Sequence, residues 1–280
     1  MNFSGGTSRI KYFQIRGLGE LSQFAGEGAP HFYVGYIIDD IDFSGIGSIG
    51  FLDDIKQIEI FKGPQSSAYG PNAMAGIINL ISHNPDNKYS FKNNLTFKSN
   101  NGYNLSTSFS IPISNNLFSN FTLMKNYSNG FITNKYKNRN NTNNKDELLF
   151  RAKFIYNPTN DIAFKLTTYL INLNNKYDVW TPDNNGFNTF TDYQGYDTQN
   201  TQAFSLVGKF NKENYRLVSI TSYSNNNITY SYDGDWANND YWAEAPYNYD
   251  ENHPEFNNWW YWSFQDSTNR VRTTLSQEIR

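Results

Sequence analysis

The stretch IEIFKGPQSSAYGPNAMAGIINLIS, residues 58–82, decides the fold that we expect for this chain. It contains an alternating strand, a Gly63-Pro64 turn, a run of small residues and a second apolar strand. The first strand ends at the turn, because proline removes a backbone donor and glycine adopts backbone angles that other residues avoid. The small side chains that follow allow close backbone packing. Such a unit predicts a segment that fits inside a larger enclosure.

The composition of the whole chain indicates what this enclosure is. The 280 residues include 38% hydrophobic and 18% aromatic side chains, and the mean hydropathy of -0.69 is low for a soluble core of this size. In a closed membrane barrel only alternate residues of each strand face lipid, so the chain can be polar on average. No stretch approaches the roughly 20 continuous apolar residues of a membrane helix. If the chain meets a bilayer, we expect it to do so as strands.

Charge and cysteine content exclude several functional classes. A formal net charge of -3 argues against a nucleic-acid-binding protein, whose affinity rests on a basic surface. The chain has no cysteine, which excludes disulfides, thiolate metal ligands and cysteine nucleophiles. Its first residues lack an apolar core behind a basic start, so we expect no secretory signal peptide in this sequence.

The composition shifts between about residues 72 and 88, from glycine-rich and aliphatic to rich in asparagine, tyrosine and phenylalanine. This shift predicts a small mixed domain over residues 1–87 and a second structure over residues 88–280. Within the first domain we expect a brief helical segment near residues 51–56 and short strands at residues 13–16, 33–38 and 57–61.

The second part alternates apolar and polar residues over segments of about ten residues, which is typical of transmembrane strands. In residues 103–113 the apolar face holds Tyr103, Leu105, Phe109, Ile111 and Ile113. Similar segments begin at residues 89, 117, 148, 162 and 204, whereas residues 214–224 alternate poorly and residues 270–280 only moderately. Together these segments predict about eight antiparallel strands.

The connections between these segments follow a second regularity. Short links at residues 114–116, 157–160 and 211–213 alternate with long loops near residues 128–146, 175–200 and 225–269. Short turns on one rim and long loops on the other are typical of an outer-membrane barrel. A soluble all-β sandwich also has alternating strands, but it is not expected to place every long loop at one end. The barrel is therefore the favoured interpretation.

Residues 36–85 resemble a known family. The segment YIIDDIDF, followed by FLDDIKQIEIFKGPQSSAYGPNAMAGIINLISHNP, is similar to the plug domain of TonB-dependent outer-membrane receptors, and FQIRGLG at residues 13–19 fits the same plug upstream. The resemblance implies an α+β plug domain followed by antiparallel transmembrane β-barrel strands, in a family whose barrels have about 22 strands. The plug motif residues are Glu59, Gly63, Pro64, Tyr69, Gly70, Gly76 and Asn79.

The resemblance also implies a function, the energised uptake of a scarce ligand across the outer membrane of a Gram-negative bacterium. The ligand would be a ferric siderophore, a vitamin or an oligosaccharide, and the implied partners are the TonB energy-transducing complex, outer-membrane lipid and this substrate. We expect no enzymatic activity, cofactor, metal or nucleic-acid partner. The sequence lacks the TonB-contacting box and the first plug segments, so we expect a fragment of a longer receptor. The alternative is a β-rich surface protein that binds glycan without transport.

Two groups of residues are predicted to carry this function. Arg16 and Lys62 lie where the family commonly has arginines that pair with barrel glutamates, although lysine lacks the bidentate fork of arginine. The alternative is that both face a watery lumen. The second group is the loop at residues 241–262, because exposed aromatic residues at this density usually need a partner. Its candidates for substrate contact are Trp242, Tyr247, Tyr249, Trp259, Trp260 and Trp262.

The aromatic residues of this loop have two alternative roles besides substrate contact. They would either pack on one another within a folded loop or form an aromatic girdle at the lipid boundary. The carboxylates of the loop offer hard oxygen ligands for a cation, but no metal site is predicted. Other motifs carry no expected chemistry. Gly45, Gly47 and Gly50 match a dinucleotide-binding pattern, yet the next strand begins too soon to leave room for the required helix. No catalytic constellation stands out.

Overall fold

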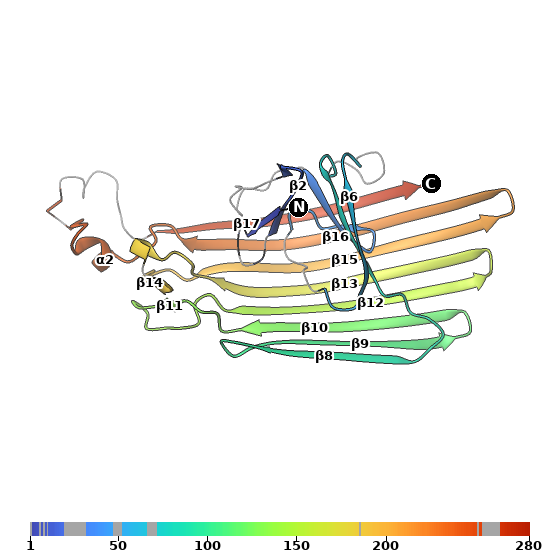
Figure 1. Cartoon of the computed structure of the whole chain (residues 1–280), viewed down its shortest axis with the longest axis horizontal. Coiled ribbons are helices and arrows are strands. Elements are labelled where there is room, and N and C mark those ends of the chain that lie inside the picture. The colour runs from blue at the N-terminus through green and yellow to red at the C-terminus, as the bar shows by residue number, and fades with distance from the viewer. Residues whose placement is uncertain are drawn as a thin grey trace.

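The computed structural model describes residues 2–5, 7, 9, 11–19, 32–46, 52–65, 72–184, 186–250, 252–253 and 264–280. This part of the chain has two layers, a large antiparallel sheet and smaller N-terminal sheets that lie across its middle (Figure 1). We call the described residues up to Ser82 the plug. Within the described ranges, no helix combines the length and the apolar character needed to cross a membrane.

The large sheet contains eight antiparallel strands in the order β17-β16-β15-β13-β12-β10-β9-β8, as the sequence predicts. Segments that alternate poorly in the sequence are also strands, because pairing with well-formed neighbours holds them in register. The strands are β8 (Ser90–Lys98), β9 (Gly102–Ser114), β10 (Leu117–Ser128), β12 (Lys145–Thr159), β13 (Ile162–Tyr177), β15 (Gly195–Lys212), β16 (Tyr215–Asp233) and β17 (Gln265–Ile279).

The two faces of this sheet have opposite character, and the apolar face points outward. Phe91 is 73% exposed and Leu275 is 72% exposed, whereas Lys153 and Thr167 are fully buried. Successive side chains of a strand point to opposite faces, so the alternation in the sequence separates the two sets. The outer face of the sheet is therefore largely apolar, and a mainly polar face with some buried apolar side chains is turned towards the plug.

All the long loops lie at one end of the sheet (Figure 1). At the opposite end, two residues join β9 to β10, β12 to β13 and β15 to β16, whereas the loop end holds residues 129–144, 178–194 and 234–264 together with the short β8–β9 turn at residues 99–101. The strands continue further into the long loops than the sequence pattern indicates, since β16 pairs with its neighbours up to Asp233. The loops hold β11 (Thr133–Asn134), β14 (Asn188–Thr189), the 3-10 helix η1 (Pro182–Asn184) and α2 (Asn239–Ala243).

The plug consists of two small sheets. One contains β1 (Asn2–Gly5), β2 (Lys11–Ile15) and β3 (Leu18–Gly19), and the other has the order β5 (Ile41–Asp42), β4 (Val34–Ile38), β7 (Gly76–Ser82) and β6 (Ile55–Lys62). The predicted strands at residues 13–16, 33–38 and 57–61 are confirmed as β2, β4 and β6. The predicted helical segment near residues 51–56 is wrong. In its described part a turn leads directly into β6, and Asp54 has a φ of 57°, which does not continue a right-handed helix.

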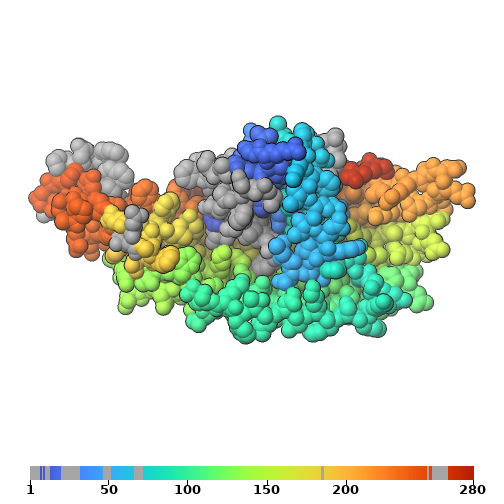
Figure 2. All heavy atoms as spheres, viewed as in Figure 1, coloured from blue at the N-terminus to red at the C-terminus, as the bar shows by residue number. Residues whose placement is uncertain are grey.

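One apolar cluster joins the plug to the sheet. The plug contributes Ile38, Ile41 and Leu80, and the inner face of the sheet contributes Leu149 and Ile171, among others. All of these side chains are buried. The plug therefore packs directly on the sheet, and its atoms cover the middle of the sheet in Figure 2.

Candidate functional site at the interface between plug and sheet

Asp39 lies at the centre of the polar contacts between plug and sheet. It follows β4 at the start of a turn, with a φ of 47° that asparagine and aspartate tolerate better than most residues. Within the plug its carboxylate accepts hydrogen bonds from the amide and the hydroxyl of Ser82, at 3.0 and 2.6 Å. From the sheet, Lys153 Nζ donates at 3.1 Å and the hydroxyl of Tyr169 at 2.6 Å. The ion pair of Asp39 and Lys153 is fully buried.

The surroundings of Asp39 favour its ionised form. Burial by itself would raise the pKa of this carboxyl group, but the Lys153 ammonium and the hydrogen bonds from Ser82 and Tyr169 outweigh burial and lower the pKa to about 2. A buried carboxylate with several donors stabilises the structure that supplies them. The docked plug is therefore stabilised by Asp39 only while this carboxyl group is ionised.

Acid is expected to release this contact. The pKa of Asp39 is lower in the docked plug than its ordinary value of 3.8, so its stabilisation is complete above about pH 4 and is lost as the pH falls through about 2. Hydrogen exchange of β4 and β7, corrected for the intrinsic exchange rate at each pH, measures this loss. The variant Asp39→Asn does not titrate and should show a weaker acid dependence between pH 4 and 2. Equal acid dependence of the two proteins would exclude Asp39 as its source.

A second buried ion pair holds the turn that precedes β6. Asp54 is paired with Arg151, and both side chains are almost completely buried. The same carboxylate accepts hydrogen bonds from Thr122 Oγ1 at 3.0 Å and Ser108 Oγ at 3.1 Å. These three partners lie on β9, β10 and β12. One plug carboxylate therefore contacts three adjacent strands of the sheet.

Three further ion pairs join the plug to the sheet. Arg9 donates from Nε to Asp197 at 2.8 Å, and this pair is buried. The other two are partly exposed, and exposed pairs contribute little to stability because water screens them. They join Asp40 to Lys165 at 2.9 Å and Asp42 to Arg272 at 3.8 Å. The buried pairs of Asp39, Asp54 and Arg9 are therefore the ones that fix the plug.

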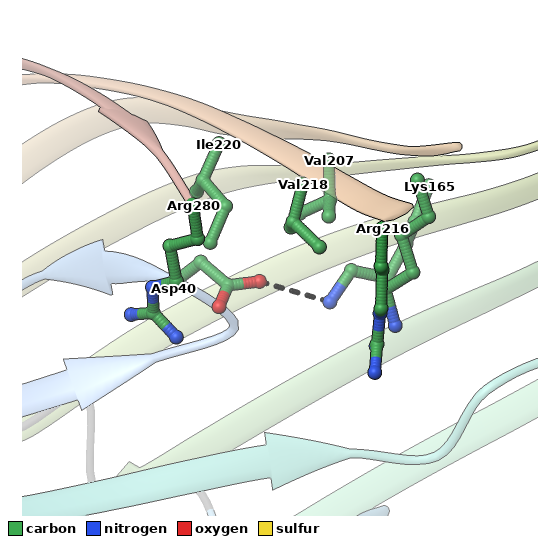
Figure 3. A pocket seen from close by; sticks show the side chains of 8 residues that line it. Asp40, Lys165, Val207, Arg216, Val218, Ile220 and Arg280 are labelled. Carbon is green, nitrogen blue, oxygen red and sulfur yellow. Dashed lines mark hydrogen bonds and ion pairs between the residues drawn. The ribbon is translucent and has the colours of Figure 1, made fainter. Parts of the chain in front are cut away.

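A cavity of about 430 Å³ lies beside the Asp39-Asp40 turn, with its lining residues shown in Figure 3. The sheet contributes Lys165, Lys209 and Arg216, and Arg280 lies directly after β17. Asp40 is the acidic residue of this lining, and it is already paired with Lys165. Arg280 is also paired, with Glu278, so Lys209 and Arg216 are the cations that give the cavity a positive potential, which suits an anionic ligand.

Arg16 and Lys62, the predicted partners of barrel glutamates, both lie exposed on the plug. Arg16 occupies a turn between β2 and β3 with a φ of 55°. Among the ion pairs between described residues, neither side chain takes part. Their pairing with glutamates stays a prediction.

The plug motif residues that the structure describes lie in the β6–β7 hairpin. Glu59 and Asn79 are opposite each other in the two strands, and Asn79 Nδ2 donates to the Glu59 carboxylate at 2.9 Å. Gly63 ends β6 with a φ of 102°, Pro64 follows, and Gly76 begins β7 with a φ of 149°. Both glycines thus have backbone angles that other residues rarely adopt. Tyr69 and Gly70 lie outside the described residues.

The described aromatic residues of the loop at residues 241–262 pack on one another. Trp242 and Tyr247 have ring centroids 4.8 Å apart at an interplanar angle of 72°, and Tyr249 lies 4.5 Å from His253. The hydroxyls of Tyr241 and Tyr247 donate to the carboxylate of Asp183 in the neighbouring loop. These contacts fit the alternative of a folded loop with its own aromatic packing. Trp259, Trp260 and Trp262 lie outside the described residues, so substrate contact by this loop stays a prediction.

The residues that join the plug to the sheet are not those that the sequence analysis selects. Arg151 and Lys153 are cations on the polar face of an otherwise well-alternating strand. This position could have indicated that the two cations have acidic partners inside the barrel. Asp39 and Asp54 give no comparable signal, because aspartates are common in turns. The partners of Asp39, Asp54 and Asp197 also lie 97 to 188 residues away in the chain. Pairing over such separations depends on the three-dimensional arrangement.

Comparison with known proteins bears on both parts of the chain. Residues 1–77 match the family described as TonB-dependent Receptor Plug Domain. A stretch of 49 residues, 18% of this chain, is 35% identical to the pesticin receptors of Yersinia enterocolitica and Yersinia pestis. This stretch covers 7% of those relatives.

Solved structures show the same fold over most of the chain. The ferric yersiniabactin uptake receptor FyuA from Yersinia pestis aligns with 82% of this chain at a TM-score of 0.73 and 19% identity, and the aligned part is 37% of that protein. The siderophore receptor PiuA from Acinetobacter baumannii aligns with 81% of the chain and 32% of its own length, at a TM-score of 0.61 and 11% identity. The chain therefore spans about a third of the length of these receptors.

The fold class expected from the sequence is confirmed by these findings, a plug domain followed by antiparallel strands of a partial barrel. The plug match includes Asp39, Asp54 and all of β6, and it ends at the start of β7. The shared fold covers 82% of the chain and therefore extends beyond the plug into the large sheet. Residues 1–77 thus match the plug domain of the TonB-dependent receptors, and the chain shares the fold of such receptors, a plug domain with strands of a barrel.

Proposed function

We propose that this protein takes part in the energised uptake of a ferric siderophore across the outer membrane of a Gram-negative bacterium. The buried polar interface around Asp39 and Lys153 is the observation that carries the proposal. It lies on the inner face of a sheet whose outer face is apolar. An apolar outer surface suits lipid, and a plug held by polar contacts suits a pore that opens and closes.

The polar contacts allow the plug to move without a large loss of hydrogen bonds. Water that enters the interface can hydrogen-bond the carboxylates, lysines and arginines that the plug leaves. Energy from the inner membrane, delivered through TonB, would drive this exchange. The cations beside the Asp39-Asp40 turn, Lys165, Lys209 and Arg216, would then face an anionic ligand on its way past the plug.

The relatives favour a ferric siderophore over a vitamin or an oligosaccharide as the substrate. FyuA is described as a ferric yersiniabactin uptake receptor, and PiuA as a siderophore receptor. The proposal assigns residues 1–87 to the plug domain and residues 88–280 to the barrel wall. The long loops, including residues 241–262, would meet the ligand first because they lie at one end of the sheet.

Uptake measurements test the proposed function directly. The gene that encodes this chain would be deleted in its own bacterium, and uptake of iron-55 from a panel of ferric siderophores would be measured during iron limitation. We expect uptake of at least one siderophore to fall about tenfold or more, as it also should when TonB is removed, because passive passage of such ligands is slow. Cobalamin and maltodextrin uptake provide the controls. Loss of either control with all siderophore uptake intact would contradict the choice of substrate.

A further inference from the structure

Three carboxylates from two long loops converge near the loop end of the sheet. Asp192 lies between β14 and β15, Asp233 is the last residue of β16, and Asp235 follows it. One carboxylate oxygen from each residue lies within 4.8 Å of the others. Asp233 and Asp235 are each only 3% exposed. Like charges at this distance repel one another strongly when they are buried.

The hydrogen bonds of this cluster leave one oxygen of each buried carboxylate open towards the others. Asp233 accepts through Oδ2 from the amides of Asp192 at 2.9 Å and Tyr193 at 3.4 Å. Asp235 accepts through Oδ2 from the amide of Phe264 at 3.3 Å. The Oδ1 atoms of Asp233 and Asp235 are buried and receive no hydrogen bond from any residue that the structure describes. A buried carboxylate oxygen without a donor is costly unless a cation compensates it.

Within the described ranges, the ion pairs do not include Asp233 or Asp235, the two buried members of this cluster. Their buried carboxylates are therefore not compensated by a cationic side chain of that part of the protein, and a bound cation would supply this compensation.

We propose that Asp192, Asp233 and Asp235 bind a calcium ion that fastens the two loops to each other. Calcium takes hard oxygen ligands at about 2.3–2.6 Å in flexible geometry, so oxygens on opposite sides of one ion are up to about 5 Å apart. The spacing of the three carboxylate oxygens suits this ion. Magnesium demands near-ideal octahedral geometry, which is a stricter requirement than the flexible coordination of calcium for three carboxylates that come from two loops.

The position of the site suggests what the ion does. Beyond the carboxylates, the same two loops are joined by a bridge between Phe190 and Ala237 and by Asn238 Nδ2, which donates to Phe190 O at 2.7 Å. Trp242 lies on α2, and the next described aromatic residues of the loop, Tyr247 and Tyr249, follow this helix. A bound ion would hold these residues in place above the sheet, and its removal would loosen them through repulsion between the carboxylates.

Titration of the purified protein with calcium tests the proposal. After treatment with chelator, calcium binding would be followed by calorimetry, and terbium luminescence would be followed with excitation of Trp236, which is next to Asp235 in the chain. We expect one site, with binding at least about tenfold weaker in Asp235→Asn because one charged ligand is lost. The matched control Asp240→Asn removes an exposed charge from the same loop, and it should bind as the unchanged protein does.

Thermal unfolding distinguishes a calcium site from a shared proton. Calcium should raise the melting temperature of the unchanged protein, since a ligand that binds only the folded state stabilises it. The variant Asp235→Asn should unfold at the same or a higher temperature than the unchanged protein without calcium, because repulsion is relieved, and it should not respond to calcium. No response of the unchanged protein, equal binding by the two variants, or an equal response to magnesium would each overturn the assignment.

Discussion

Replacement of Asp39 by alanine is expected to destabilise the docked plug by about 3–5 kcal/mol, the usual cost of leaving one partner of a buried ion pair alone. Lys153 would keep the backbone oxygen of Ser82 at 3.2 Å but would lose its countercharge. The amide of Ser82 and the hydroxyl of Tyr169 would lose their acceptor as well. Hydrogen exchange of β4 and β7 in detergent should therefore accelerate by roughly two to four orders of magnitude.

Three further variants separate the charge effect from a general loss of packing. Lys153→Met leaves the Asp39 carboxylate with its donors from Ser82 and Tyr169, so we expect a smaller loss than for Asp39→Ala. The double variant should recover most of the loss, because no unpaired charge is left inside the interface. Lys212→Met breaks the exposed pair with Asp161 and should change nothing measurable. Equal exchange in Asp39→Ala and Lys212→Met would refute the role of Asp39.

Gly76→Ala is expected to disrupt the plug sheet itself. A methyl group at this position would overlap the backbone oxygen of Phe61 and lie 2.7 Å from Ile15 Cδ1. The side chain of Ile15 can move, but Phe61 is held in the β6–β7 pairing opposite Ile77. The φ of 149° adds backbone strain. We expect a loss of about 3 kcal/mol or more in the stability of β6 and β7, measured by hydrogen exchange of these two strands.

Gly63→Ala is the matched control for this substitution. Gly63 lies in the same hairpin and also has a positive φ, of 102°, but a methyl group there would meet no atom within 4 Å. Only the backbone strain remains, so the loss should be about 1 kcal/mol. The prediction fails if the two alanine variants exchange alike, because the overlap with Phe61 is what distinguishes them.

The sequence predicts the sheet well because each strand is marked by a pattern of neighbouring residues. The alternation of apolar and polar residues over residues 103–113 predicts a strand, since successive strand side chains point to opposite faces, and β9 covers this stretch. The plug strands β4 and β6 are also marked by short apolar runs. The helical segment near residues 51–56 fails because the Asp53-Asp54 turn is fixed by contacts with the sheet, such as the pair of Asp54 with Arg151. Tertiary contacts outweigh local preference there.

The candidate site could be predicted only in part, since it is made by residues far apart in the chain. The motif pair of Glu59 and Asn79 lies within one hairpin, and the resemblance selects both residues. Asp39 and Lys153 are 114 residues apart, and the sequence pattern around one does not predict its pairing with the other. The cluster of Asp192, Asp233 and Asp235 cannot be predicted for the same reason, because its members come from two loops that meet only in the folded chain.

Most ion pairs between plug and sheet share one polarity, which bears on how such receptors can be recombined. Of the five pairs among the described residues, four place the acid on the plug and the cation on the sheet, and the pair of Arg9 with Asp197 is the reverse. A plug grafted from another receptor would be accepted here only with carboxylates opposite Arg151 and Lys153. A basic residue at either place would set like charges against each other in a buried site. Chimaeric receptors therefore need halves that are matched in charge, even where their backbones superimpose.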